Sequence, residues 1–170
     1  MGNLGTKIAQ DIRNRFNSGE FTKKVVEPSS DIHISSIRKL SKQGKDASGG
    51  DFFPLNEPYA KDKQEQGGSG IADLYSADSS EHALDDMYAT SQDKGFDLEF
   101  KSAHQEDYMG AHYEGSRARG DFGDMPVRKW FPTENDMSKP PQQRNIEQIE
   151  KIIERYINED RTIRVKGKVT

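Results

Sequence analysis

An α+β fold is predicted from three stretches of the chain, two with helical and one with strand periodicity. Residues 142–158 place an isoleucine or tyrosine at every third or fourth position, which is the strongest helical pattern in the sequence. Residues 3–18 place an apolar side chain at every fourth position, and Gly19 is the expected end of that helix. Residues 95–100, GFDLEF, alternate apolar and acidic side chains, as a half-buried strand does.

The segments between these elements give weaker signals. In residues 23–40 two adjacent valines favour a strand, Pro28 interrupts it, and a short helix could follow. Residues 41–70 are polar and rich in glycine, so we expect a flexible loop insertion there. Residues 71–90 indicate a short helix, a polar break, and then either a strand or a second helical turn.

Composition restricts the classes of protein to which the chain can belong. Only 31% of its 170 residues are apolar and 32% are charged, so we expect one domain over residues 1–160 with a small core and much loop or partner-covered surface. The net charge of −4 gives no support to general nucleic-acid binding. Cysteine is absent, which excludes disulfides and thiolate metal sites and favours folding in the cytosol. No signal peptide or membrane-spanning run is recognisable, so we expect no membrane partner.

The last ten residues, 161–170, are interpreted as a basic C-terminal arm. Their alternation of basic and β-branched side chains favours an exposed strand that adds to the sheet of a neighbouring protein, and a disordered tail is the alternative. The expected interface residues are Arg161, Ile163, Arg164, Val165, Lys166 and Lys168.

No residue pattern in the sequence indicates catalysis, a cofactor or a metal. There is no nucleophile elbow, no cysteine nucleophile, and no phosphate-binding loop at the glycine-rich residues 67–70. His104 and His112 lie eight residues apart, a spacing that fits no standard zinc pattern. We therefore expect a protein that is not an enzyme, and a metallo-hydrolase built on these two histidines is a minor alternative.

The most distinctive stretch is residues 108–131. Tyr108 and His112 would share one face of a short helix, and Gly115 allows a turn after it. A polar loop follows up to Pro126. We expect His112 to be a structural hydrogen-bonding residue, because no nucleophile accompanies it.

Two aromatic residues close this stretch. Trp130 and Phe131 are expected to be buried between the sheet and the C-terminal helix, near Ile149 and Ile153.

The order of these pieces resembles the phage virion morphogenesis family, the tail-completion proteins of Mu-like and related tailed phages. That family has a Tyr-x3-His-x2-Gly element, a loop rich in glycine and arginine, and a Pro-x-Arg-x element with an aromatic or leucine pair. The resemblance covers roughly residues 3–158, but it departs from the family pattern at residues 71–90. An aromatic-x-Pro-Leu anchor in the polar loop, here Phe52, Pro54 and Leu55, agrees with it. The motif positions in this sequence are Tyr108, His112, Gly115, Arg117, Arg119, Pro126, Arg128, Trp130 and Phe131.

The resemblance implies a small, mostly antiparallel sheet packed on the long C-terminal helix, with an N-terminal helix and long loops. It further implies a structural virion protein that joins head and tail as an oligomeric ring, a hexamer or a dodecamer, in the phage neck. Its partners would be copies of itself and other neck, connector, tail-terminator or tail-tube proteins, assembled in the host cytoplasm, with no sequence-specific nucleic acid. The alternative is a small nucleic-acid-binding protein. That protein would use Arg117, Arg119, Arg128, Lys129 and Trp130.

Overall fold

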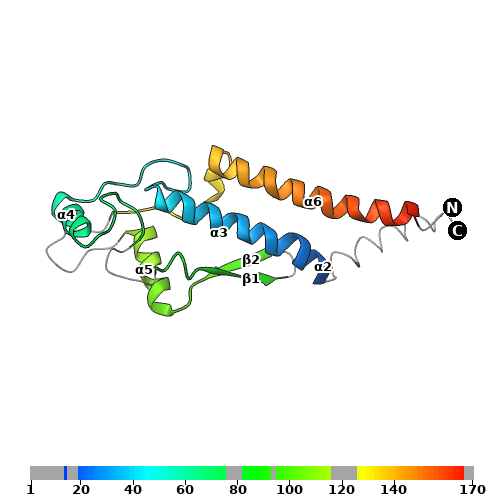
Figure 1. Cartoon of the computed structure of the whole chain (residues 1–170), viewed down its shortest axis with the longest axis horizontal. Helices are drawn as coiled ribbons and strands as arrows, with labels where there is room; N and C mark the ends of the chain where they lie inside the picture. Colours follow the sequence, from blue (N-terminus) through cyan, green and yellow to red (C-terminus); the bar gives the residue numbers. More distant parts are fainter. Residues whose placement is uncertain (1–13, 15–18, 76–81, 93–94, 116–125, 167–170) are drawn as a thin grey trace.

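The molecule is elongated, with two long helices that run side by side along it (Figure 1). The computed structural model describes residues 14, 19–75, 82–92, 95–115 and 126–166. In chain order the elements are α2 (Gly19–Phe21), the π-helical turn η1 (Thr22–Val26), α3 (Glu27–Lys42), α4 (Glu57–Glu65), β1 (Tyr88–Gln92), β2 (Gly95–Glu99), α5 (Ala103–Glu114), the 3-10 turn η2 (Glu134–Asp136) and α6 (Pro140–Lys166).

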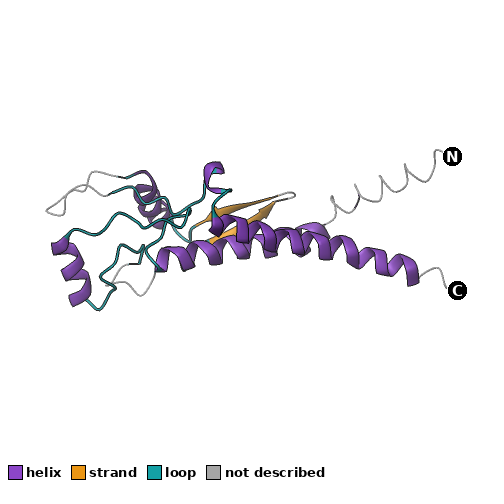
Figure 2. Cartoon of the chain, turned by 90° about the horizontal axis from the view of Figure 1, so that it is seen from above, coloured by secondary structure: helices purple, strands orange, loops and turns teal. Residues whose placement is uncertain are grey.

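Helix α3 lies between α6 and a β-hairpin (Figures 1 and 2). Strands β1 and β2 pair antiparallel, with Tyr88 opposite Glu99 and Gln92 opposite Gly95. This mixture of helices and one antiparallel sheet confirms the α+β class. The expected packing was wrong in one respect, because the sheet contacts α3 and η1 rather than the C-terminal helix.

The hairpin buries one of its two faces. Ala89 and Leu98 pair across the strands and pack against the core, while Tyr88, Asp97 and Glu99 are exposed on the other face. Successive side chains in a strand point to opposite faces, which is why the alternation in residues 95–100 identified β2 correctly.

The strand that the two valines near residue 25 favour is not formed, and a helical segment takes its place. The chain is helical from Gly19 to Lys42. The helix expected over residues 3–18 lies, apart from residue 14, outside the described residues. Val25 and Val26 are both buried in the π-helical turn. Pro28 stands in the first turn of α3, where a missing N–H is tolerated. The ring of a proline inside a helix clashes with the carbonyls of the preceding turn, and here that preceding turn is the wider π-helical one.

Residues 41–75 contain more regular structure than a flexible insertion would. Asn56 caps α4 by accepting the N–H of Tyr59 at 3.0 Å, and Pro58 stands in its first turn. The short helix expected near residue 71 is absent, since residues 71–75 have no helical or strand structure. Phe52 is buried and Leu55 packs against the core, so the expected anchor joins this segment to the rest of the fold.

Among the described residues, a cluster of apolar side chains forms a core between α3, the hairpin and α5. The large side chains Leu74, Leu84, Met87 and Met109 are at most 2% exposed. The remaining members of the cluster are Ile34, Ile37, Phe52, Ala72, Ala83 and Trp130. None of these residues comes from α6.

Helix α6 contributes no residue to this cluster and is attached to the rest of the fold by polar and aromatic contacts. The side chain of Gln142 donates to the carbonyl of Ala47 at 2.8 Å, and Tyr156 packs edge-on against Phe21 at 5.7 Å between ring centroids. The helix continues to Lys166, so the strand expected at residues 161–166 is a helix instead, and residues 167–170 lie outside the described part of the chain. Within the described ranges, no helix is both long enough and apolar enough to span a bilayer.

The hairpin is joined to α3 by one arginine side chain. Arg38 donates from Nε to the carbonyl of Leu84 at 2.7 Å, and from one Nη to the carbonyls of Asp85 and Met87, each at 2.8 Å. These carbonyls belong to the turn that leads into β1. Arg38 therefore fixes where the hairpin begins relative to α3.

Replacing this side chain should loosen the hairpin. Arg38→Met keeps most of the aliphatic volume but removes three hydrogen bonds from a charged donor, so we expect the free energy of unfolding to fall by about 2–3 kcal/mol. Urea denaturation measures this change. Lys39→Met, at an exposed position of the same helix, is the matched control and should stay within about 0.5 kcal/mol of the wild type. Equal effects of the two substitutions would contradict the assignment.

Candidate functional site

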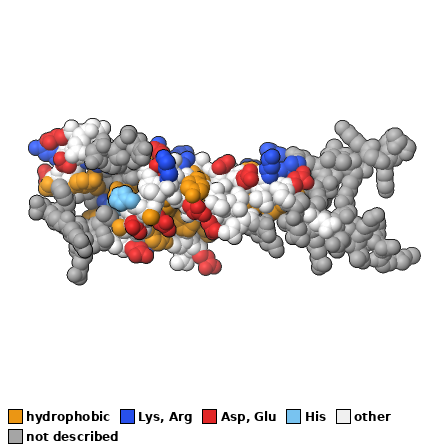
Figure 3. Space-filling model, turned by 90° about the horizontal axis from the view of Figure 1, so that it is seen from below, with side chains coloured by type: hydrophobic (Ala, Val, Ile, Leu, Met, Phe, Trp, Pro, Cys, Tyr) orange, Lys and Arg blue, Asp and Glu red, His pale blue; other side chains and the backbone are white. Residues whose placement is uncertain are grey.

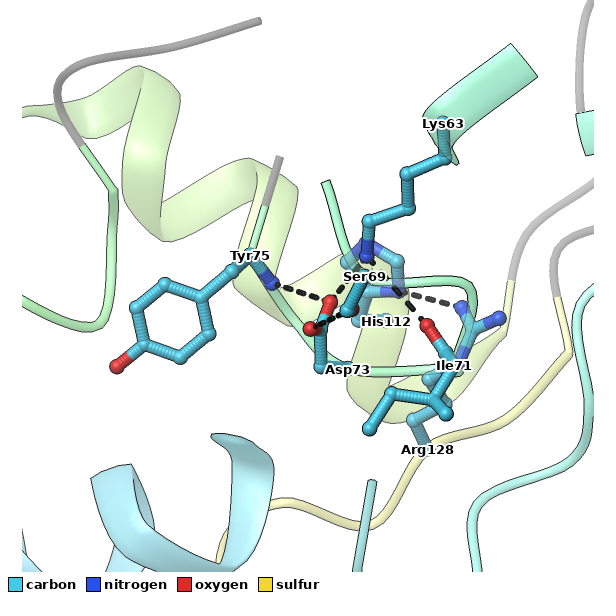
Figure 4. A network of polar contacts seen from close by, with 7 residues as sticks. All are labelled: Lys63, Ser69, Ile71, Asp73, Tyr75, His112 and Arg128. Atoms are coloured by element: carbon cyan, nitrogen blue, oxygen red, sulfur yellow. Dashed lines mark hydrogen bonds and ion pairs between the residues drawn. The ribbon is translucent and has the colours of Figure 1, made fainter. Parts of the chain in front are cut away.

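Four charged or polar side chains are buried together where α4, α5 and the segment after residue 126 meet (Figure 4). Lys63, His112 and Arg128 are 4%, 6% and 5% exposed, and the side chain of Asp73 is 8% exposed. We call these four residues the Arg128 cluster. Ionisable side chains are rarely buried this deeply, which makes the cluster the most distinctive chemical feature of the described chain.

One half of the cluster is an ion pair between α4 and the segment that follows it. Lys63 pairs with Asp73, and its ammonium also lies 3.5 Å from the carbonyl of Ile71. Asp73 accepts two further hydrogen bonds, from the hydroxyl of Ser69 and from the N–H of Tyr75 at 3.2 Å. The carboxylate is therefore fully engaged, and it holds residues 69–75 against α4. Because Lys63 offsets its charge, Asp73 is a poor base for activating Ser69.

The other half of the cluster is a contact between α5 and the segment after it. In the side chain of Arg128, the guanidinium nitrogen Nη1 lies 3.0 Å from Nδ1 of His112. In the backbone, the N–H of Arg128 donates to the carbonyl of His112 at 2.7 Å. The ring of Tyr108 stacks edge-on against His112 at 4.5 Å. Gly115, with φ of 79°, ends α5 as expected and turns the chain away.

Electrostatics fixes the protonation state of the histidine. Burial lowers the pKa of His112 to about 4, and the positive charges of Arg128 and Lys63 act in the same direction. The ring is therefore neutral near pH 7, and Nδ1 must accept from Arg128, which places the ring proton on Nε2. Burial also lowers the pKa of Arg128, which nevertheless keeps its charge.

Two buried nitrogens of the cluster have no hydrogen-bond partner. They are Nε2 of His112 and Nε of Arg128. With Lys63 and Arg128 positive, Asp73 negative and His112 neutral, the cluster carries one net positive charge. Such an arrangement can bind an anion.

Two of the motif residues that follow Arg128 differ in burial: Trp130 is buried and Phe131 is exposed. Trp130 is buried, donates from Nε1 to the carbonyl of Met109 at 2.9 Å, and packs edge-on against Phe100. These neighbours come from α5 and from the residue that follows β2, whereas the expected neighbours were Ile149 and Ile153 of α6. Phe131 is 40% exposed, so its expected burial was wrong, because adjacent residues of this extended segment face opposite ways. Pro126 is partly buried at the start of the segment.

The remaining sequence-based candidates are not part of the cluster. Lys129 is exposed and lies over the ring of Tyr113 at 4.1 Å. Arg128 and Trp130 are buried, so neither side chain is part of an exposed basic or stacking surface. Three further candidates, Arg117 and Arg119 of the loop up to residue 125 and Lys168, lie outside the described residues. Of the expected interface, only the helical backbone of Arg161, Ile163, Arg164, Val165 and Lys166 is described.

The two histidines considered for metal binding do not meet. His104 is exposed at the start of α5 and His112 is buried near its end, about 12 Å further along the helix axis. Across the described ranges, no group of three or more histidine, aspartate or glutamate side chains is placed to hold a metal ion.

A groove of about 560 Å³ lies between α3 and α6. Its walls combine the charged residues Asp31, Lys39 and Arg144 with the apolar Ile32 and Leu40. Because both signs of charge line it, the groove favours no one class of ligand.

Comparison with protein-family models, with curated proteins and with solved structures found no match for this chain.

Breaking the buried ion pair should be costly, while removing both partners should not. Asp73→Asn leaves the Lys63 ammonium buried without a counter-charge, and we expect a loss of about 3 kcal/mol or more in the free energy of unfolding. The double variant Lys63→Met with Asp73→Leu should recover much of that loss. Lys61→Met removes an exposed pair with Glu65 on the same helix, and it should cost less than about 1 kcal/mol. A double variant less stable than Asp73→Asn would contradict this account.

The histidine should make the fold sensitive to acid. The pKa of His112 in the folded state, about 4, lies below the unfolded value of 6.5, so its contribution is complete above pH 6.5 and is lost as the pH falls toward 4. We expect a slope of up to about 1.4 kcal/mol per pH unit in that window. In His112→Asn the slope should decrease but persist in part, because burial also lowers the pKa of His33. Urea midpoints at several pH values measure it, with His104→Asn as control; an unchanged slope in His112→Asn would disprove the assignment.

Proposed function

We propose that this chain is a structural subunit of an oligomeric assembly, and that the assembly is the ring that joins head and tail in the neck of a tailed bacteriophage. The observation that carries the first half is the hairpin, whose two strands leave two edges that pair with no third strand among the described residues. Several large apolar side chains of the described residues are exposed as well: Tyr88, Val127, Phe131 and Ile157 are each at least 40% exposed.

The hairpin is one surface that neighbouring subunits could cover. It has two strands and therefore two edges, and within the described residues neither edge pairs with a third strand. Acidic and apolar side chains lie side by side on the face of the molecule that carries α5 and the hairpin (Figure 3). Tyr88 of β1 is 46% exposed, and its hydroxyl donates to Glu99 at 2.8 Å. Open edges of this kind are either protected or used for assembly.

The second half of the proposal rests on the resemblance. Its motif residues are spread over two dozen positions, and His112, Arg128 and Trp130 form one buried connection between α5 and the segment after residue 126. A shared connection of this kind is a reason for a family to keep these residue types. The partners would be copies of this chain, as a hexamer or a dodecamer, together with other neck, connector and tail proteins.

The alternative of nucleic-acid binding loses support from the same observation. Trp130 would have to stack on bases, yet it is buried in the fold. Of the four basic residues in that alternative, Arg128 is buried, Lys129 is exposed, and Arg117 and Arg119 lie outside the described residues.

Assembly and joining are tested separately. We expect the purified protein to form closed rings with a mass of six or twelve times 19.2 kDa, alone or on addition of the connector, as measured by mass photometry and electron microscopy. A phage that lacks the gene should accumulate separate filled heads and tails, and the purified protein should restore infectious particles. The chain's assignment to the neck would fail if joined, infectious particles formed normally without it.

A further inference from the structure

One nitrogen of the Arg128 guanidinium is bound and another has no partner. Nη1 lies 3.0 Å from Nδ1 of His112. Nε is buried and has no hydrogen-bond partner. In a guanidinium, Nε and Nη2 form the edge on the opposite side from Nη1, with two N–H groups that point in parallel. Arg128 therefore has an unused buried donor, Nε–H, on its Nε–Nη2 edge.

Nothing on the described chain neutralises this charge. No carboxylate of the described ranges forms an ion pair with Arg128. The nearest candidate, Asp73, acts on Arg128 electrostatically but is already engaged by Lys63, Ser69 and the N–H of Tyr75. A buried charge without a counter-charge is costly, and buried donors normally have acceptors.

We propose that the Nε–Nη2 edge of Arg128 binds one oxyanion, a carboxylate or phosphate group, side-on through two parallel N–H···O bonds. Arginine is suited to this geometry because its planar fork matches the two oxygens of such a group. Binding satisfies the orphaned Nε and cancels the net positive charge of the Arg128 cluster. The inference does not depend on the proposed ring.

The site lies close to the surface. In the segment from residue 126 to 131, Val127, Lys129 and Phe131 are exposed while Arg128 and Trp130 are buried. Arg128 is thus one side chain below an exposed backbone segment without regular structure. The phenols of Tyr59 and Tyr108, each partly exposed, lie within electrostatic reach of Arg128 and make its surroundings polar.

The oxyanion could come from two sources. It could be a small ion such as phosphate, or a carboxylate side chain of a second copy of this chain, which has 29 acidic residues. Both would use the same two N–H groups, so the experiment has to separate them.

Nuclear magnetic resonance of the arginine side chains tests the site directly. The probes are inorganic phosphate and acetate, added to dilute protein at constant ionic strength with chloride as the reference. We expect a saturable shift of the Arg128 Nε–H signal and a rise in the pKa of His112, because the anion offsets the neighbouring charge. Arg128→Lys keeps the charge but loses the fork, and its affinity should be at least about tenfold weaker. Arg144→Lys, at an exposed arginine of α6, is the matched control and should bind as the wild type does.

Sedimentation velocity on the same variants identifies the source. If a second copy supplies the carboxylate, self-association should weaken in Arg128→Lys and on addition of phosphate, but remain unchanged in Arg144→Lys. If a free ion is the ligand, the signal shifts in dilute protein and self-association does not respond. The proposal is overturned if a folded wild-type protein shows no saturable shift and its self-association responds neither to phosphate nor to Arg128→Lys.

Discussion

The sheet of this protein has two strands, and a two-stranded hairpin is marginal unless something outside it holds it. Arg38 supplies that hold, because a single guanidinium on α3 binds three carbonyl oxygens of the turn before β1. Two of those carbonyls belong to Leu84 and Met87, whose side chains are fully buried in the core. The same three hydrogen bonds therefore set both the position of the hairpin and the packing beneath it.

Arg38 and Arg128 differ in how completely their hydrogen-bond donors are satisfied. Arg38 is saturated by backbone acceptors, so its charge is spread over a fixed part of the fold. Arg128 is buried more deeply, yet among the described residues its side chain bonds to the neutral ring of His112 and its Nε has no partner. A fold that needed only rigidity at this place could use an apolar residue at lower cost. The incomplete satisfaction of Arg128 is therefore better explained by a ligand than by stability.

Local periodicity predicted those parts of the fold in which one element alone determines the pattern. Strand β2 and the middle of α6 belong to this group, because their apolar residues repeat with the period of the element. The adjacent Val25 and Val26 favour a strand by their intrinsic propensity, yet they lie in a helical segment. Both are buried because this segment has neighbours on two sides, and that packing overrides the propensity. Residues 161–166 alternate like a strand but continue an existing helix, which avoids the cost of nucleation.

The cluster could be predicted only in part, for a physical reason. His112 and Arg128 belong to one short stretch, so a motif could identify them. Lys63 and Asp73 stand in a polar, glycine-rich region, and nothing in their spacing indicates that both would be buried. Their burial follows from the small apolar core, which lies between α3, the hairpin and α5 and leaves the α4 end to be held together by charge. Arg128 lies at the same end without a carboxylate partner among the described residues, so the charges that hold this end together are not balanced by the described chain itself.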